Sequence, residues 1–263
     1  MVEETCGKTI KKIKYVKKNA VITFTDGEEL TLSINTFAHF YLYENKTLTK
    51  ADLEEIARIE NLDKSKSYCV NILYKKVYTE KEIRQKLYAR NVNYIDVNEI
   101  INYLIDNHFL NDSRYANIYA EEYLRKGYGE NKIKTSLEDK GIKEDIISTL
   151  SFDKKIEEEQ ALKIASSAIK KYVKNKSKKE TLNNIEKTLL SRGYPSNIVY
   201  KTINIIESDM PHDEETILKT QIEKYIKARH LDLGEKGNLD KVIRHFFSKG
   251  FKYEDIKKNI KED

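Results

Sequence analysis

The sequence predicts a mainly α-helical protein in which tandem three-helix repeats form an elongated array behind a small N-terminal β-strand and helix segment. Apolar residues recur at helical spacing from about residue 63 onward. Only 2 prolines and 9 glycines occur in 263 residues, which argues against a β-sandwich or a disordered chain. The charged fraction of 35% and mean hydropathy of −0.68 indicate a large exposed surface per residue, as an elongated array has.

The N-terminal segment has the pattern of two or three short strands followed by helix. Residues 10–16, 20–25 and 29–34 are rich in β-branched side chains, and Asp26-Gly27 is a hairpin turn signal. Thr49 and Asp52 then form a capping-box pattern, and we expect the segment to end near Asn61. Because residues 1–63 carry a net negative charge, they are expected to make no direct contact with phosphate and to be partly dispensable for binding.

A four-fold repeat follows, at intervals of 50, 52 and 57 residues. Each copy has two apolar residues four apart, then Gly or Asn four residues later, then another apolar residue. The copies are Ile83-Leu87-Asn91-Val92, Ile133-Leu137-Gly141-Ile142, Ile185-Leu189-Gly193-Tyr194 and Val242-Phe246-Gly250-Phe251. The apolar pair lies on one helix face, and Gly or Asn ends the helix in the left-handed conformation.

One helix precedes and one follows each of these segments, so each unit holds three helices. The expected division is a β-meander plus helix over 1–62, followed by four three-helix repeats over 63–110, 111–152, 153–208 and 209–263. A unit of this size cannot hide its apolar face alone, so neighbouring units must stack.

Basic residues show two regularities. The residue before each helix-ending Gly or Asn is basic: Arg90, Lys140, Arg192 and Lys249. Such residues complement the helix dipole, or they form a row of cations facing a periodic acidic partner. In addition, residues 153–206 carry 12 Lys and Arg against 6 Asp and Glu, with a cluster at Lys170, Lys171, Lys174, Lys176, Lys178 and Lys179. This cluster is either a solvated helix end or a phosphate-binding surface.

The second repeat carries a recognisable motif. His108-Phe109-Leu110-Asn111-Asp112-Ser113-Arg114-Tyr115-Ala116 leads to Lys126-Gly127-Tyr128-Gly129 and then to Lys140-Gly141-Ile142. This stretch resembles the RecX family, the regulators of the RecA recombinase, in its longer Gram-positive form, and residues 79–87 are similar to the family's opening motif. The sequence departs from the family pattern at Asn91, Glu130 and Ser136.

The resemblance implies a non-enzymatic modulator, mostly an inhibitor, in homologous recombination, DNA repair and the SOS response. Such a protein binds along the groove of the RecA–single-stranded-DNA filament and suppresses ATP hydrolysis, strand exchange and filament growth. It is expected to be a cytoplasmic monomer that binds single-stranded DNA more weakly alone. The resemblance nominates Arg84, Lys86, Arg90, Arg114, Arg125, Lys126, Lys132 and Lys140 as contacts, and Asp112, Tyr115, Gly127, Tyr128, Gly129 and Gly141 as turn-shaping residues.

We find no pattern for a catalytic site, a metal or a cofactor. The histidines lack metal-ligand spacing, no phosphate-binding loop is present, and Glu157-Glu158-Glu159 is interpreted as a solvated face. Cys6 and Cys69 suit a reduced compartment, and no apolar stretch is long enough to span a membrane. Two other functions stay open. One is general single-stranded DNA binding through the lysine cluster; the other is a helix-turn-helix transcriptional regulator.

Overall fold

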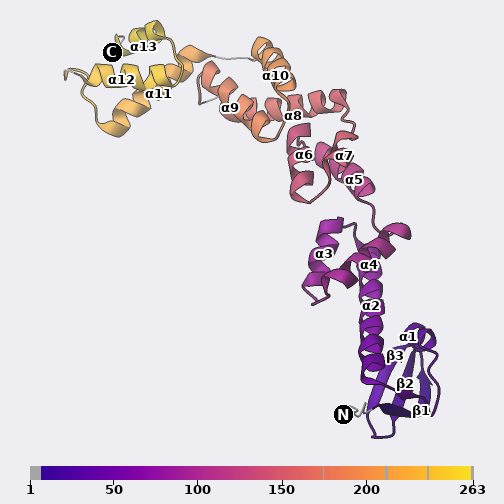
Figure 1. Ribbon diagram of the computed structural model, residues 1–263. Coiled ribbons are helices and arrows are strands. Elements are labelled where there is room, and N and C mark those ends of the chain that lie inside the picture. The colour runs from indigo at the N-terminus through magenta and orange to yellow at the C-terminus, as the bar shows by residue number, and fades with distance from the viewer. Residues whose placement is uncertain (1–6, 174, 211–212, 236, 262–263) are drawn as a thin grey trace. The chain divides into compact units, whose positions relative to one another are not determined.

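The computed structural model describes residues 7–173, 175–210, 213–235 and 237–261 (Figure 1). The chain divides into two compact units with a boundary between Tyr115 and Ala116. The described residues form thirteen helices and one small sheet. The predicted fold class, mainly α with tandem three-helix repeats behind a short strand segment, is therefore confirmed.

The N-terminal segment is a four-stranded antiparallel sheet with one helix-covered face. Its strands are β1 (Lys8–Val16), β2 (Asn19–Phe24), β3 (Glu29–Ser33) and β4 (Thr47–Leu48), in the order β3-β2-β1-β4. The predicted Asp26-Gly27 turn joins β2 to β3, with Gly27 at a φ of 90°. Buried Ile10, Ile22 and Leu32 pack with side chains of α1 (Ile34–His39) and α2 (Lys50–Lys75), such as Phe37 and Ile56.

The helix that follows the sheet is longer than expected. Thr49 and Asp52 form the predicted capping box at the start of α2, but the helix continues through Asn61 to Lys75, which corrects the expected end. No glycine or proline interrupts residues 50–75. Leu62 and Cys69 are buried in the core that α2 shares with the next two helices, so packing also favours continuation. The expected boundary between residues 62 and 63 therefore lies inside α2.

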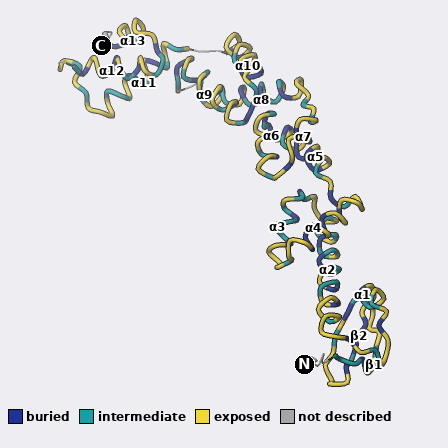
Figure 2. Tube along the Cα trace, in the orientation of Figure 1, coloured by how far each residue is buried: buried dark blue, intermediate teal, exposed yellow. Residues whose placement is uncertain are grey.

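Twelve of the helices form four consecutive groups of three. After α2, these are α3 (Glu80–Tyr88), α4 (Tyr94–Asp106), α5 (Asp112–Arg125), α6 (Glu130–Asp139), α7 (Glu144–Ser148), α8 (Lys154–Tyr172), α9 (Lys178–Ser191), α10 (Ser196–Asp209), α11 (Glu214–Arg229), α12 (Asn238–Ser248) and α13 (Tyr253–Lys261). The predicted repeat segments are α3, α6, α9 and α12. Figure 2 marks buried residues on the helices of these groups, and buried side chains from all three helices cluster together in the first, third and fourth groups.

The repeated apolar pair is the centre of each three-helix core. Its eight members are at most 1% exposed: Ile83, Leu87, Ile133, Leu137, Ile185, Leu189, Val242 and Phe246. Each helix then ends in the same way, with Asn91, Gly141, Gly193 or Gly250 in the left-handed region. The amide of the next residue returns to the carbonyl of the second apolar residue, at 3.0–3.2 Å. This pattern is a Schellman motif, and it confirms the predicted helix ends.

Asn91 is the one non-glycine residue among these four ends, with a φ of 59°. Asn91→Ala is expected to lower the free energy of unfolding by about 1 kcal/mol, because a Cβ without a compensating polar group is disfavoured in this conformation. Asn91→Gly should leave stability unchanged or raise it. Urea unfolding followed by circular dichroism measures both, and equal stability of the two variants would contradict the assignment.

Candidate functional site

The four basic residues that precede the left-handed positions all lie against aromatic rings. The Arg90 guanidinium carbon is 4.2 Å from the ring centre of Tyr68 in α2, and Lys140 Nζ is 5.7 Å from that of Tyr119 in α5. Arg192 lies 5.8 Å from Tyr128, and Lys249 lies 5.6 Å from Phe246. Cation–π contact holds each cation at the C-terminal end of its helix, where it also complements the helix dipole. Arg90 is exposed, whereas the other three are half-buried.

The Gly127-Tyr128-Gly129 turn, predicted to shape the chain, forms a joint between the second and third repeats. The Gly129 amide donates to Arg192 O at 2.9 Å, and the Asn131 amide donates to Gly193 O at 3.0 Å. The C-terminal carbonyls of α9 thus satisfy amides at the start of α6, which would otherwise lack partners. The Arg192 side chain adds a further contact, since its Nη1 donates to Gly127 O at 3.2 Å.

A buried carboxylate completes this joint. Glu157 of α8 is 1% exposed, and its Oε1 accepts a hydrogen bond from the Glu130 amide at 2.8 Å. Burial raises the pKa of Glu157, with a further contribution from the nearby Glu130 carboxylate. The interpretation of Glu157-Glu158-Glu159 as a solvated face is therefore wrong for Glu157. No local sequence signal distinguishes it from Glu158 and Glu159, because only the tertiary fold places the start of α6 beside α8.

The joint between the third and fourth repeats has the same chemistry. Ser177, the N-cap of α9, donates its hydroxyl to Lys249 O at 2.5 Å, again placing a helix start against the C-terminal end of the next repeat's middle helix. The Lys178 amide donates to Glu214 Oε1 at 2.9 Å, as the Glu130 amide does to Glu157. Sequence reasoning missed both Ser177 and Glu214. The second, third and fourth repeats are therefore connected through equivalent helix ends, by backbone hydrogen bonds at the first joint and by side-chain-to-backbone hydrogen bonds at the second.

The first unit contains the corresponding carboxylate contact. The amide of Glu80, at the start of α3, donates to Asp112 Oδ1 at 2.9 Å. Thr79 and Glu82 form the predicted capping box beside it. Asp112 therefore belongs to the turn motif for a physical reason, since its carboxylate caps the preceding repeat's middle helix. Tyr115 is buried, and His108, interpreted as structural, takes the left-handed position that ends α4.

The other basic residues predicted as contacts fall into two groups: those whose side chains already contact other protein groups, and those that are exposed. Arg84 is engaged, since it donates to Glu80 Oε1 and Asn98 Oδ1 at 2.7 Å each. Lys126 pairs with Glu122 at 2.6 Å, and Lys86 Nζ lies 5.0 Å from the ring centre of Tyr78. The exposed members are Arg114, Arg125, Lys132, Lys170 and Lys171. Lys174 lies outside the described residues.

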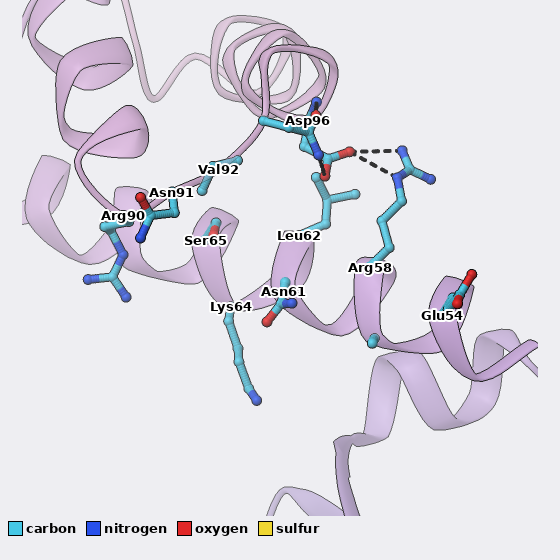
Figure 3. A pocket seen from close by; sticks show the side chains of 12 residues that line it. Glu54, Arg58, Asn61, Leu62, Lys64, Ser65, Arg90, Asn91, Val92 and Asp96 are labelled. Carbon is cyan, nitrogen blue, oxygen red and sulfur yellow. Dashed lines mark hydrogen bonds and ion pairs between the residues drawn. The ribbon is translucent and has the colours of Figure 1, made fainter. Parts of the chain in front are cut away.

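A groove in the first unit brings Arg90 near two other cations. It has a volume of about 890 Å³ and lies between α2 and the turn that joins α3 to α4 (Figure 3). Arg58 is held by Asp96, whose Oδ1 lies 3.0 Å from Nε and 2.9 Å from Nη2. Lys64 pairs with Glu60 at 3.3 Å. Arg90 is therefore the groove cation that remains most available to an anionic partner.

The described residues contain no group of His, Cys, Asp and Glu side chains arranged to hold a metal ion. Burial raises the pKa of the Cys69 thiol to about 11, which disfavours the reactive thiolate at neutral pH. Among the described helices, none combines the length and the apolar character needed to cross a bilayer. Tandem three-helix units with repeated joints between them and exposed cations define a helical-repeat protein.

Comparison with known proteins agrees with this class. The family model described as "RecX, second three-helix domain" matches residues 111–149. Regulatory protein RecX of Listeria innocua is 31% identical over 86% of this chain and 85% of its own length. Those of Lactococcus lactis subsp. lactis and Bacillus velezensis are 29% and 28% identical, covering 96% and 97% of this chain and 96% and 98% of the relatives.

Solved structures show the same fold. A crystal structure of regulatory protein RecX, 24% identical, aligns with a TM-score of 0.66 over 75% of this chain and 98% of that one. A structure of RecX from Lactobacillus salivarius, 26% identical, aligns with a TM-score of 0.53 over 57% of this chain and 98% of that one. The chain belongs to the RecX family, and it is a regulatory protein of the RecX type.

Proposed function

We propose that this protein regulates the RecA recombinase by binding along the RecA–single-stranded-DNA filament, without catalysing a reaction itself. Bound there, it suppresses ATP hydrolysis, strand exchange and filament growth. Family membership supports the choice of partner. The protein acts as a cytoplasmic monomer, and its affinity for single-stranded DNA alone is weaker than for the filament.

The observation that carries this proposal is the repeated joint. Gly129 on Arg192 and Ser177 on Lys249 join the second to the third and the third to the fourth repeat through equivalent helix ends, which supports a recurring presentation of side chains along these three repeats. A filament is a periodic polymer whose DNA phosphates and acidic side chains also recur at regular intervals. A chain of equivalent units therefore suits a filament better than it suits one isolated site.

Arg90 and Lys140 occupy equivalent positions in the first and second repeats, each against a ring of its repeat's first helix. Charge reversal at both, Arg90→Glu with Lys140→Glu, is expected to raise the concentration needed for half-inhibition about tenfold, because attraction becomes repulsion. The measurement is ATP hydrolysis by the cognate RecA on circular single-stranded DNA, with this protein titrated in.

The matched control is Lys219→Glu with Lys224→Glu, two exposed lysines of α11 that are not nominated contacts. It changes the net charge equally and should retain inhibition. Equal loss in both variants, with helical circular dichroism intact, would remove Arg90 and Lys140 from the interface. No inhibition by the unmodified protein at any ratio would reject the proposed function itself.

Exposed Lys170 and Lys171 at the C-terminal end of α8 favour a second candidate, general single-stranded DNA binding. Under that function, the protein would retain an oligonucleotide tightly without RecA and with a steep dependence on salt. Binding that becomes much tighter once RecA is present would favour the filament regulator instead.

A further inference from the structure

The N-terminal sheet carries a cluster of lysines, although residues 1–63 as a whole have a net negative charge. Six lysines and no acidic residue occur between Gly7 and Thr25, all on β1 or the turn after it. Lys8 pairs with Asp26 at 2.9 Å and with Glu28. The other five are exposed, and no ion pair holds their side chains within the described part of the chain: Lys11, Lys12, Lys14, Lys17 and Lys18. We call these five the β1 lysine cluster.

Strand register places part of this cluster on the open face of the sheet. Ile13 is opposite Ile22, whose side chain is in the core beneath α1 and α2. Lys12 is opposite Thr23 and Lys14 is opposite Val21, so their side chains project from the other face. The two lysines are two residues apart on one strand, roughly 6.8 Å. This spacing is of the same order as that of successive phosphates in an extended single strand.

The turn after β1 shows backbone strain at a lysine. Lys17 has a φ of 57°, a conformation that Gly, Asn or Asp adopts at lower cost in a tight hairpin. Lys17 and Lys18 are exposed at the tip, which extends the charge beyond the end of β1. Strained positions of this kind are found at binding sites more often than elsewhere.

Exposed aromatic rings lie beside the same strand. Ile10 donates to Lys46 O at 2.9 Å and Asn45 donates to Ile10 O at 2.8 Å, so the segment before β4 runs alongside β1. In or next to this segment, the Tyr43 side chain is 62% exposed and that of Tyr41 is 83% exposed. Lys46 Nζ lies 5.7 Å from the ring centre of Tyr43, so this ring already has a cation beside it. Exposed rings and unpaired lysines on one small sheet domain match the two parts of a nucleotide, a flat base and a phosphate.

We infer that the open face of the N-terminal sheet binds single-stranded nucleic acid, with the β1 lysine cluster on phosphates and Tyr43 stacked on a base. Two acidic side chains lie nearby and accept hydrogen bonds from neutral groups, Glu44 Oε1 from the Ile13 amide at 3.3 Å and Glu29 Oε1 from the Thr23 hydroxyl at 3.4 Å. The five lysines of the β1 lysine cluster outnumber these two carboxylates, so the local charge is positive. The inference rests on the proposed function in one respect, since single-stranded DNA is a component of the filament. It replaces the expectation that residues 1–63 avoid phosphate.

The test is fluorescence anisotropy of a labelled oligothymidylate with the full chain and no RecA. Lys12→Gln, Lys14→Gln and Lys17→Gln together are expected to weaken binding at least tenfold near 0.1 M salt. They should also reduce the slope of log affinity against log salt by about 2, since each lost contact contributes roughly 0.7. The matched control removes three exposed lysines of α11, Lys219→Gln, Lys224→Gln and Lys227→Gln, and should change affinity less than threefold.

Substitution of Tyr43 provides a second, independent test of the same inference. Tyr43→Ala should weaken binding about fivefold or more, whereas Tyr43→Phe should retain it, because stacking needs the ring and not the hydroxyl. Equal affinities of the lysine variant and its control, with circular dichroism unchanged, would overturn the inference. Because RecA is absent, a negative result here leaves the proposed regulation of RecA to be judged by the ATP hydrolysis assay.

Discussion

Gly193→Ala is expected to lower the free energy of unfolding of residues 116–263 by roughly 2–5 kcal/mol, the largest effect among the predicted substitutions. Gly193 has a φ of 84°, where an alanine is strained by about 1–2 kcal/mol. Its added Cβ would also overlap the backbone and Cβ of Lys132 in the neighbouring repeat. Overpacking against backbone adds about 1–3 kcal/mol, because backbone cannot move aside as a side-chain tip can.

The joint between the second and third repeats should open in this variant. The Gly129 and Asn131 amides, which donate to Arg192 O and Gly193 O, are expected to exchange hydrogen faster than in the unmodified protein. Urea unfolding followed by circular dichroism measures stability, and native-state hydrogen exchange measures the joint. If the repeated joints set the spacing of the units, this variant should also inhibit RecA less at temperatures where it stays folded.

Gly237→Ala is the matched control for Gly193→Ala. Gly237 is also left-handed, with a φ of 97°, but no atom lies within 4 Å of an added Cβ. Gly237→Ala should therefore lower the free energy of unfolding only through backbone strain, by about 1–2 kcal/mol. Equal losses in the two variants would mean that the contact with Lys132 contributes nothing and that the joint tolerates a methyl group.

Glu157→Ala is expected to lower the free energy of unfolding by about 1–3 kcal/mol, because it leaves the Glu130 amide without its acceptor inside the joint. Glu159→Ala, two residues away on an exposed position, should stay within about 0.5 kcal/mol. Glu157→Gln keeps an oxygen that can accept the hydrogen bond and removes the buried charge. In urea unfolding at pH 7, the free energy of unfolding of Glu157→Gln should therefore equal or exceed that of the unmodified protein, and that of Glu157→Ala should be lower.

The pH dependence of stability tests the same residue. Burial raises the pKa of Glu157 above its ordinary 4.5, so the folded protein holds this proton more tightly than the unfolded chain. Its contribution is fully present below pH 4.5 and is lost as pH rises through the folded-state pKa. The unmodified protein should lose stability across that window relative to Glu157→Gln. Parallel stability curves for the two proteins would contradict a buried, protonation-sensitive Glu157.

Local sequence patterns were sufficient to predict the repeat. Helical spacing, the capping boxes at Thr49 and Thr79, and the Gly or Asn at each helix end are short-range features, because a few adjacent residues decide them. The motif at residues 108–142 likewise identified the family from contiguous residues. The end expected for the N-terminal segment, near Asn61, falls inside α2, because continuation of this helix depends on burial of Leu62 and Cys69 against α3 and α4, which lie later in the chain.

What the sequence determined by itself is the set of helices, their shared ends and the family, since each depends on neighbours within a few residues. Only the tertiary structure decided which charged side chains have an interaction partner. Glu157 and Glu159 are alike in sequence, yet one caps the start of α6 while the other faces solvent, because only folding places a helix start beside α8. The same holds for Lys8, which pairs with two carboxylates, and Lys12, which remains unpaired on an open sheet face. Which charge finds a partner is a property of packing across long sequence separations, and local pattern carries no information about it.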